Sequence, residues 1–305
     1  MSTAHWLALT QVAGVGGVTA RRLLEQFGSI EAIFEASVAE LVSVPRVSDR
    51  IAHAIREAPL DLLDAELLQL CEEGIVVLTW DDGAYPANLR ATADAPALLF
   101  VRGDILPEDE NAVAVVGTRQ PSPEGLQAAQ ALARELAWRR LTVVSGLAQG
   151  VDTAAHQGAL EAGGRTLAVL GSGLRVIHPQ SNAQLAGQIV EHGALISELH
   201  PSAPPLGRHL MARDRIISGL CRAVIVVEAG VSSGSMDTAA KARAQGRLLL
   251  AVDGGSEGTT RLLTEGALPV LTADLDFDAL ATLIAQHAVA APDSPASTEQ
   301  LTLGV

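Results

Sequence analysis

Residues 145–156 combine residue types that favour an anion-binding turn. They follow an apolar run at 141–144, which is typical of a buried parallel strand. Gly146 and Gly150 permit a tight turn, and Asp152 stands where the N-cap of the next helix is expected. A strand that enters a helix in this way directs backbone N–H groups at one point, which attracts anions. The chemistry that this segment predicts is phosphate recognition.

Apolar runs alternate with helical segments around this turn. Strands are predicted at 113–116, 141–144, 166–170, 194–196, 223–227, 248–252 and around Val270, with helices between them, for example at 124–138 and 235–244. This alternation predicts an α/β fold: a Rossmann-like, doubly wound, mostly parallel sheet with helices on both faces. Ligands of such sheets bind beyond the carboxyl ends of the strands, where the glycine-rich motifs of this chain lie.

A small helical domain is expected before the sheet. A glycine turn at 14–17 precedes an amphipathic helix, and a degenerate copy follows at 44–51, which is similar to the helix-hairpin-helix pattern. Because this region is acidic, a helical interaction module is favoured there over DNA binding. The chain then divides into a helix-hairpin-helix/SAM-like domain (1–70), a connector with one strand (71–112), a Rossmann-like domain (113–275), and a short helix with a tail expected to be disordered (276–305).

The formal net charge of −14 argues at first against a nucleic-acid partner. The charge is unevenly distributed, because residues 1–112 carry −11, residues 113–220 carry +2 and residues 221–305 carry −5. The basic side chains therefore gather in the segment that holds the predicted anion-binding turns. All of them except Lys241 are arginines, whose planar guanidinium forms bidentate contacts with phosphate and stacks on bases.

Several classes of protein are not expected. No apolar run is long enough to span a bilayer and no basic segment typical of a signal peptide opens the chain, so we expect a cytoplasmic protein without membrane contact. Cys71 and Cys221 are too few for a zinc site and are expected to be small core residues. No metal, cofactor or catalytic residue is predicted. A dinucleotide-dependent oxidoreductase is disfavoured, because no Gly-x-Gly-x-x-Gly turn follows the first strand of the parallel sheet.

Taken together, the motifs resemble those of the DprA/Smf family, DNA processing protein A. The matching segments are 115–119, 145–160, 170–174 with His178, Pro179 and Asn182, then 197–198, 213–220, 226–229, 233–235 and 266–267. Their order and spacing agree over about residues 75–270. The resemblance implies a non-catalytic protein that binds single-stranded DNA, forms a homodimer through the Rossmann-like domain, protects incoming DNA and loads the RecA recombinase during natural transformation.

The glycine-rich turns, together with the arginines that the resemblance implies, predict which residues contact nucleic acid. These are Gly117, Thr118, Arg119, Ser145, Gly146, Gly150, Gly171, Gly173, Arg208, His209, Arg213, Arg215, Ser233, Gly234 and Ser235. Arg119 stands at the family's phosphate-binding arginine, and Arg213 and Arg215 stand at its paired arginines. Since residues two apart on a helix do not share a face, one of the pair is expected to contact DNA while the other pairs with Glu198 or Asp214. Ser233 to Ser235 form either a second phosphate nest or an ordinary helix cap.

The chain departs from the family at positions near the expected site. Leu210 and Met211 replace a Phe-Pro pair, His178 replaces a tyrosine, and Asp214 replaces an asparagine. No Phe, Tyr or Trp occurs between Arg139 and Asp276. Base stacking on aromatic side chains contributes about 1–3 kcal/mol per base in single-strand binders. Without it, binding is expected to rest on phosphate contacts, with a steep salt dependence and weak base preference.

An enzyme of different function is the alternative hypothesis. Residues 253–259 are similar to the Pro-Gly-Gly-x-Gly-Thr turn of nucleotide phosphoribohydrolases of the lysine-decarboxylase-like group, which share a similar sheet. The proline of that turn is missing here, and no arginine–glutamate pair with a catalytic pattern accompanies it. Release of free base from nucleoside monophosphates is the reaction that would distinguish this enzyme from a DNA-binding protein.

Overall fold

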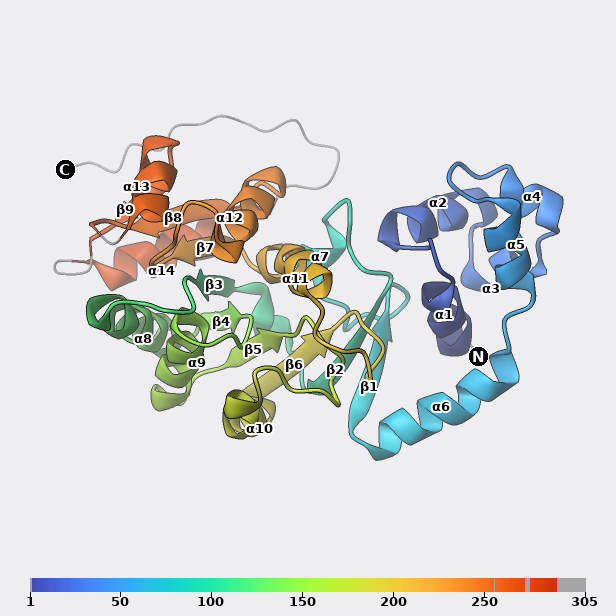
Figure 1. Cartoon of the computed structure of the whole chain (residues 1–305), viewed down its shortest axis with the longest axis horizontal. Coiled ribbons are helices and arrows are strands. Elements are labelled where there is room, and N and C mark those ends of the chain that lie inside the picture. The colour runs from blue at the N-terminus through green and yellow to red at the C-terminus, as the bar shows by residue number, and fades with distance from the viewer. Residues whose placement is uncertain (1, 255, 272–274, 290–305) are drawn as a thin grey trace.

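The computed structural model describes residues 2–254, 256–271 and 275–289 (Figure 1). In these ranges nine strands form one sheet in the order β1-β2-β6-β5-β4-β3-β7-β8-β9. The strands are β1 (Ile75–Thr79), β2 (Leu98–Gly103), β3 (Ala112–Val116), β4 (Thr142–Ser145), β5 (Thr166–Val169), β6 (Gly193–Ser197), β7 (Ala223–Val226), β8 (Leu248–Val252) and β9 (Leu268–Val270). Strands β3 to β9 pair in parallel, whereas β1 and β2 are antiparallel.

Helices cover both faces of the sheet, as the alternation of strands and helices predicts. One face packs against α7 (Ala87–Arg90), α11 (Gly207–Leu220), α12 (Gly234–Ala244) and α13 (Glu257–Thr264), and the other against α8 (Pro123–Trp138), α9 (Val151–Glu161) and α14 (Phe277–Gln286). Within β3, Val113 and Val115 point to the second face while Ala114 and Val116 point to the first, so the strand is apolar throughout.

Strand β2 was not predicted from the sequence. Its first four residues form an apolar run that periodicity alone does not distinguish from a helix. In the structure β2 pairs with both β1 and β6, so two antiparallel strands from the predicted connector extend the sheet. Shorter helices η1 (Pro107–Glu110), η2 (Gln180–Asn182) and α10 (Ala183–His192) complete this part of the chain.

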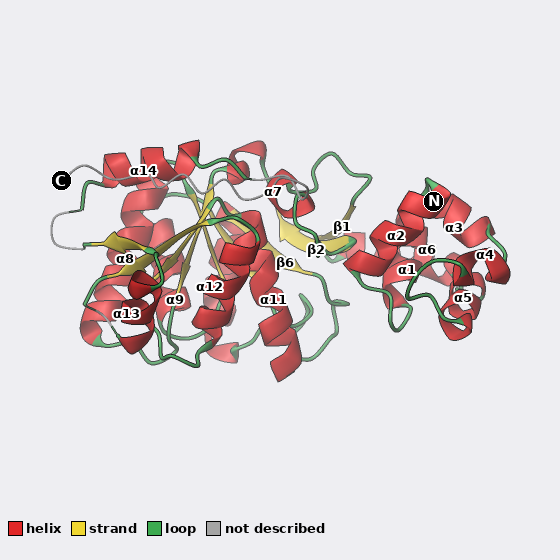
Figure 2. Cartoon of the chain, turned by 90° about the horizontal axis from the view of Figure 1, so that it is seen from above, coloured by secondary structure: helices red, strands yellow, loops and turns green. Residues whose placement is uncertain are grey.

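The N-terminal segment is helical, as predicted, and lies beside the β1 edge of the sheet (Figure 2). It contains α1 (Ser2–Gln11), α2 (Gly17–Phe27), α3 (Ile30–Glu35), α4 (Val38–Val42), α5 (Asp49–Arg56) and α6 (Leu60–Glu72). The buried Trp6 indole N–H donates to Asp81 at 2.6 Å, and Arg175 pairs with Glu73 at 2.7 Å. These contacts join the helical domain to the sheet.

The burial of the two cysteines confirms one of the two expectations about them. Cys221 is buried, as expected, but Cys71 is exposed because it lies on the outer side of α6. Of the helices in the described ranges, none combines the length and the apolar character needed to cross a bilayer. The short helix expected near the C-terminus is α14, and the tail expected to be disordered lies at 290–305, outside the described residues.

Candidate nucleic-acid interface

A groove of about 680 Å³ opens at the carboxyl edge of the parallel strands. Its walls come from the loop after β3, the first half of α11 and the N-terminus of α12. A second hollow of about 240 Å³ adjoins it and extends to His178 and Pro179. Both hollows are lined by Arg119, Ala148 and Arg213, so they form one continuous concave track with two guanidinium groups along it. We call this track the groove.

Arg119 is the arginine of this groove that is available to a ligand. It is exposed, and within the described ranges its guanidinium forms no hydrogen bond or ion pair. The loop that carries it is fixed, because Thr118 donates its N–H to the Glu228 carbonyl at 2.7 Å and accepts from Val151 N–H at 3.2 Å. Gly150 has φ 81°, and a Cβ there would lie 2.5 Å from the Thr118 carbonyl oxygen. A rigid loop therefore presents an unpaired cation.

Arg213 has a different role, because it is 94 % buried beneath the groove. Its Nη1 donates to the Val169 carbonyl at 2.7 Å, and its Nε lies 3.0 Å from Asp214 Oδ1. The guanidinium packs against Gly146, where a Cβ would lie 1.7 Å from Nη1. Position 146 therefore requires glycine, because the Arg213 guanidinium leaves no room for a Cβ there.

Arg215 points away from the groove. Its guanidinium pairs with Glu198 and lies 3.6 Å from Asp94, and neither acid lines the groove. This confirms that the two arginines lie on different faces of α11 and that one of them pairs with Glu198. Arg213 also pairs with an acid. Its partner is Asp214, the second of the two acids that the sequence suggested for such a pair.

The prediction for the turn after β4 is wrong in one detail, and this detail affects anion binding. Gly150, not Asp152, is the N-cap of α9, and Asp152 lies in the first helical turn. From there its carboxylate accepts the N–H groups of Gly146 at 3.1 Å and Ala148 at 3.3 Å. The N–H groups expected to attract a phosphate are therefore already bound to a carboxylate of the chain itself. Burial raises the pKa of Asp152, while Arg213 opposes that rise.

Besides Arg215, six predicted contact residues lie outside the groove lining: Ser145, Gly150, Gly171, Gly173, Arg208 and His209. Ser145 is buried and donates its hydroxyl to the Val115 carbonyl at 2.8 Å. Gly171 and Gly173 are buried against Leu210 and the loop at His200, so their lack of a side chain serves packing. Arg208 and His209 belong to the first turn of α11; Arg208 is exposed, and His209 Nδ1 bonds to the Pro204 carbonyl at 3.0 Å.

Ser233, Gly234 and Ser235 line the same groove as Arg119. Ser233 is the N-cap of α12 but forms no side-chain capping bond; its hydroxyl bonds to that of Ser235 at 2.9 Å. The first N–H groups of this helix therefore lack the side-chain acceptor that a capping serine supplies. Of the two hypotheses left open for this segment, the geometry favours the anion nest.

Asp214 gives the groove a titratable negative charge. Its pKa is raised to about 6, mainly by burial and to a smaller extent by Asp152 and Asp237, while Arg213 and Lys241 oppose the rise. The sequence indicated only that an acid replaces an amide at this position. The raised pKa comes from the packing of α11, which no local pattern reveals.

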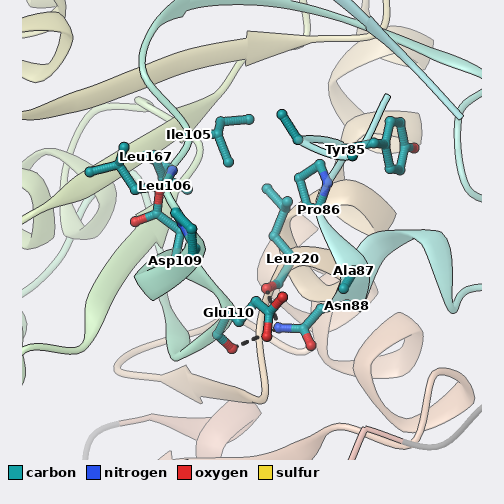
Figure 3. A pocket seen from close by; sticks show the side chains of 13 residues that line it. Tyr85, Pro86, Ala87, Asn88, Ile105, Leu106, Asp109, Glu110, Leu167 and Leu220 are labelled. Atoms are coloured by element: carbon teal, nitrogen blue, oxygen red, sulfur yellow. Dashed lines mark hydrogen bonds between the residues drawn. The ribbon is translucent and has the colours of Figure 1, made fainter. Parts of the chain in front are cut away.

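Another pocket lies at the opposite edge of the sheet, near the amino ends of β3, β5 and β7 (Figure 3). It has a volume of about 170 Å³ and is lined mainly by apolar side chains such as Ile105, Leu106 and Leu220. Asn88 donates to the Glu110 carbonyl at 2.8 Å and to the Leu220 carbonyl at 3.0 Å, so its amide is used within the fold. This pocket carries none of the predicted contact residues. In the described part of the chain no cluster of three metal-ligating side chains occurs.

Comparison with known proteins adds independent information. The family model of DNA recombination-mediator protein A matches residues 76–280, and that of the SAM-like helix-hairpin-helix tandem matches residues 7–58. Protein Smf of Escherichia coli is 40% identical over 227 residues, which cover 72% of this chain and 61% of that protein. DNA processing protein DprA of Streptococcus pneumoniae is 44% identical over 191 residues, which cover 61% of this chain and 67% of that protein. The chain thus spans about three fifths to two thirds of the length of these relatives.

Two solved structures share the fold. The X-ray structure of DNA processing protein A from Streptococcus pneumoniae superposes with a TM-score of 0.75 at 32% identity, covering 88% of this chain and 95% of that one. The structure of DNA processing protein A from Helicobacter pylori, described for its single-stranded DNA binding mode, superposes with a TM-score of 0.61 at 29% identity, covering 70% of this chain and 97% of that one. Both the predicted fold class and the predicted resemblance are confirmed.

Proposed function

Because this chain belongs to the DNA recombination-mediator protein A family, we propose that it binds single-stranded DNA along the groove. The observation that carries the proposal is Arg119: an exposed guanidinium, unpaired within the described ranges, on a rigid loop that lines the same groove as the uncapped N-terminus of α12. Phosphates crossing this space would meet Arg119 on one side and helix N–H groups on the other.

The biological role that we propose follows the resemblance. The protein protects incoming single strands and loads RecA during natural transformation, acting in the cytoplasm as a homodimer formed through the Rossmann-like domain. No catalytic step belongs to this proposal. The hydrolase hypothesis has weaker support, because the proline of its turn is missing and residues 256–259 cap and begin α13. Gly255 of that turn lies outside the described residues.

The direct test is the salt dependence of binding. Affinity for single strands falls with salt by about 0.7 logarithmic units per phosphate contact per tenfold salt, so about three contacts predict an approximately twentyfold loss between about 50 and about 200 mM salt. We expect similar affinity for oligothymidine and mixed sequences and weaker binding to duplex, measured by fluorescence anisotropy. A salt-insensitive, base-selective isotherm, or release of free base from nucleoside monophosphates, would contradict the proposal.

The raised pKa of Asp214 predicts how DNA binding depends on pH. Above pH 6 the buried carboxyl is ionised and repels phosphate; as the pH falls through about 6 it takes up a proton, so affinity should rise between about pH 7 and pH 5. Because its pKa is raised in the folded state, the same protonation also increases the free energy of unfolding in this window. Asp214→Asn should bind about fivefold more tightly at pH 7.5, which corresponds to about 1 kcal/mol.

The comparison of wild type with Asp214→Asn isolates this carboxyl from His178 and His209, which both proteins retain. We expect the difference in affinity between them to shrink as the pH is lowered toward 5, where the wild-type carboxyl is also neutral. A constant difference from pH 5 to pH 8 would show that Asp214 does not titrate at the groove.

A further inference from the structure

Trp138 is an unusual surface residue in this chain. Its side chain is 68% exposed, and it is the one aromatic among the large exposed apolar side chains of the described residues. Indole rings are mostly buried, and an exposed one frequently marks a contact site. Trp138 ends α8, one residue before the long segment that lacks aromatic residues.

Arg139 holds the Trp138 indole in place. The Arg139 guanidinium lies 5.1 Å from the Trp138 ring and 5.3 Å from the Phe277 ring of α14. Arg139 itself pairs with Glu135 at 2.8 Å and with Asp278 at 2.6 Å, so its charge is compensated. These contacts position Trp138 while leaving most of the ring exposed.

Two further arginines flank this ring. Gln127, Ala131, Arg134 and Trp138 are spaced by four, three and four residues, which places them on one face of α8. The Arg134 side chain is 50% exposed and lies 3.8 Å from Glu135, an acid that already bonds Arg139 more closely. Arg140 follows with φ 63°, is exposed, and forms no ion pair within the described ranges. We call Gln127, Ala131, Arg134, Trp138 and Arg140 the α8 face.

The α8 face begins close to the groove. The loop from Arg119 leads into α8 at its N-cap Ser122, which donates to Glu228 at 2.8 Å beside that loop. From there α8 runs sixteen residues, about 24 Å at 1.5 Å per residue, to Trp138. A single strand that leaves the groove past Arg119 therefore has a path along this helix.

We propose that the α8 face is a second contact site for the same single strand, in which a base stacks on Trp138 and neighbouring phosphates contact Arg134 and Arg140. The proposal rests on the proposed function and goes beyond it, since it supplies the base stacking that the groove lacks. Apart from Phe277 and the acids Glu135 and Asp278, which contact Arg139, the residues around Trp138 are cationic, amide or small rather than aliphatic. This composition favours a nucleic-acid strand over a protein surface.

The test compares oligonucleotides of about 6 nucleotides, which occupy only the groove, with oligonucleotides of about 30 nucleotides, which also reach α8. Trp138→Ala should weaken binding of the long strand about tenfold and leave the short strand unchanged. Trp138→Phe should retain part of the stacking and lose less. Long strands, but not short ones, should quench the tryptophan emission of the wild type, and this quenching should disappear in Trp138→Phe, because Trp6 is buried and Trp80 half-buried.

Matched variants separate the possible outcomes. Leu126→Ala removes another exposed apolar side chain of α8 outside this face and should have no effect, whereas Arg119→Ala should weaken both strand lengths. If Trp138→Ala binds long strands like the wild type while Arg119→Ala is impaired, the α8 face is not a DNA contact, and the groove remains the proposed binding site. If neither variant is impaired, the proposed function fails as well. Dissociation of a dimer by Trp138→Ala with unchanged affinity would assign the face to a protein contact and overturn the inference.

Discussion

Arg213→Ala is expected to lower the free energy of unfolding by about 3–5 kcal/mol, the cost of removing one partner from a buried ion pair. The guanidinium donates to the Val169 carbonyl, pairs with Asp214 and lies close enough to Asp152 to oppose its raised pKa. Without it, two buried carboxyls lose their cation and a carbonyl loses its donor. Urea unfolding followed by circular dichroism measures the loss. The control is Arg119→Ala, which removes an exposed arginine and should leave the midpoint unchanged.

The pH dependence of this loss identifies its cause. Both carboxyls already have raised pKa values, and removing Arg213 raises these values further. Protonation at low pH then relieves the unpaired charges, so Arg213→Ala should be less destabilised at pH 5.5 than at pH 8. Equal destabilisation at the two pH values would indicate lost packing against Gly146 rather than uncompensated charge. Because the variant affects folding, it is unsuitable as a test of DNA contact.

The parallel sheet could be predicted from the sequence because its strands are buried on both faces. Such strands are continuous apolar runs, and a glycine or serine marks where β3, β4 and β6 end. The same property concealed β2, whose apolar run had no neighbouring parallel unit to identify it. Local patterns thus predict the repeating unit of a fold better than the antiparallel strands added at its edge.

The candidate site was predicted in its general position but not in its electrostatics. The chain position of Arg119 indicated a strand-to-helix turn, and the helical period separated Arg213 from Arg215. The sequence did not show that Asp152 occupies the N–H groups of the β4 turn, because that depends on a helix starting at Gly150 with a positive φ. Nor did it show the environment of Trp138, which depends on α14 packing beside the end of α8.

These differences concentrate the proposed DNA binding on a few exposed groups. Asp152 accepts the N–H groups of the β4 turn and Arg213 donates to the Val169 carbonyl, and the attraction between their charges helps to stabilise the floor of the groove. Among the described residues, the Arg119 guanidinium has no hydrogen bond or ion pair, and no side chain caps the N-terminus of α12. The buried charges maintain the shape of the groove, and the exposed cation is left to contact the ligand.

Arg119→Ala should therefore weaken single-stranded DNA binding about tenfold or more without changing stability. A hydrogen bond to a charged group contributes about 1.5–3 kcal/mol, or roughly 10- to 150-fold in affinity. The loss should be the same for oligothymidine and mixed sequences, and the salt slope should fall by about 0.7, because one phosphate contact is removed. Arg119→Lys keeps the charge but loses the bidentate geometry, so an intermediate loss is expected. Arg261→Ala, which removes an exposed arginine of α13 that pairs only locally with Glu265, should bind like the wild type. A loss confined to one base composition, or a slope that does not change, would mean that Arg119 contacts something other than the backbone of the strand.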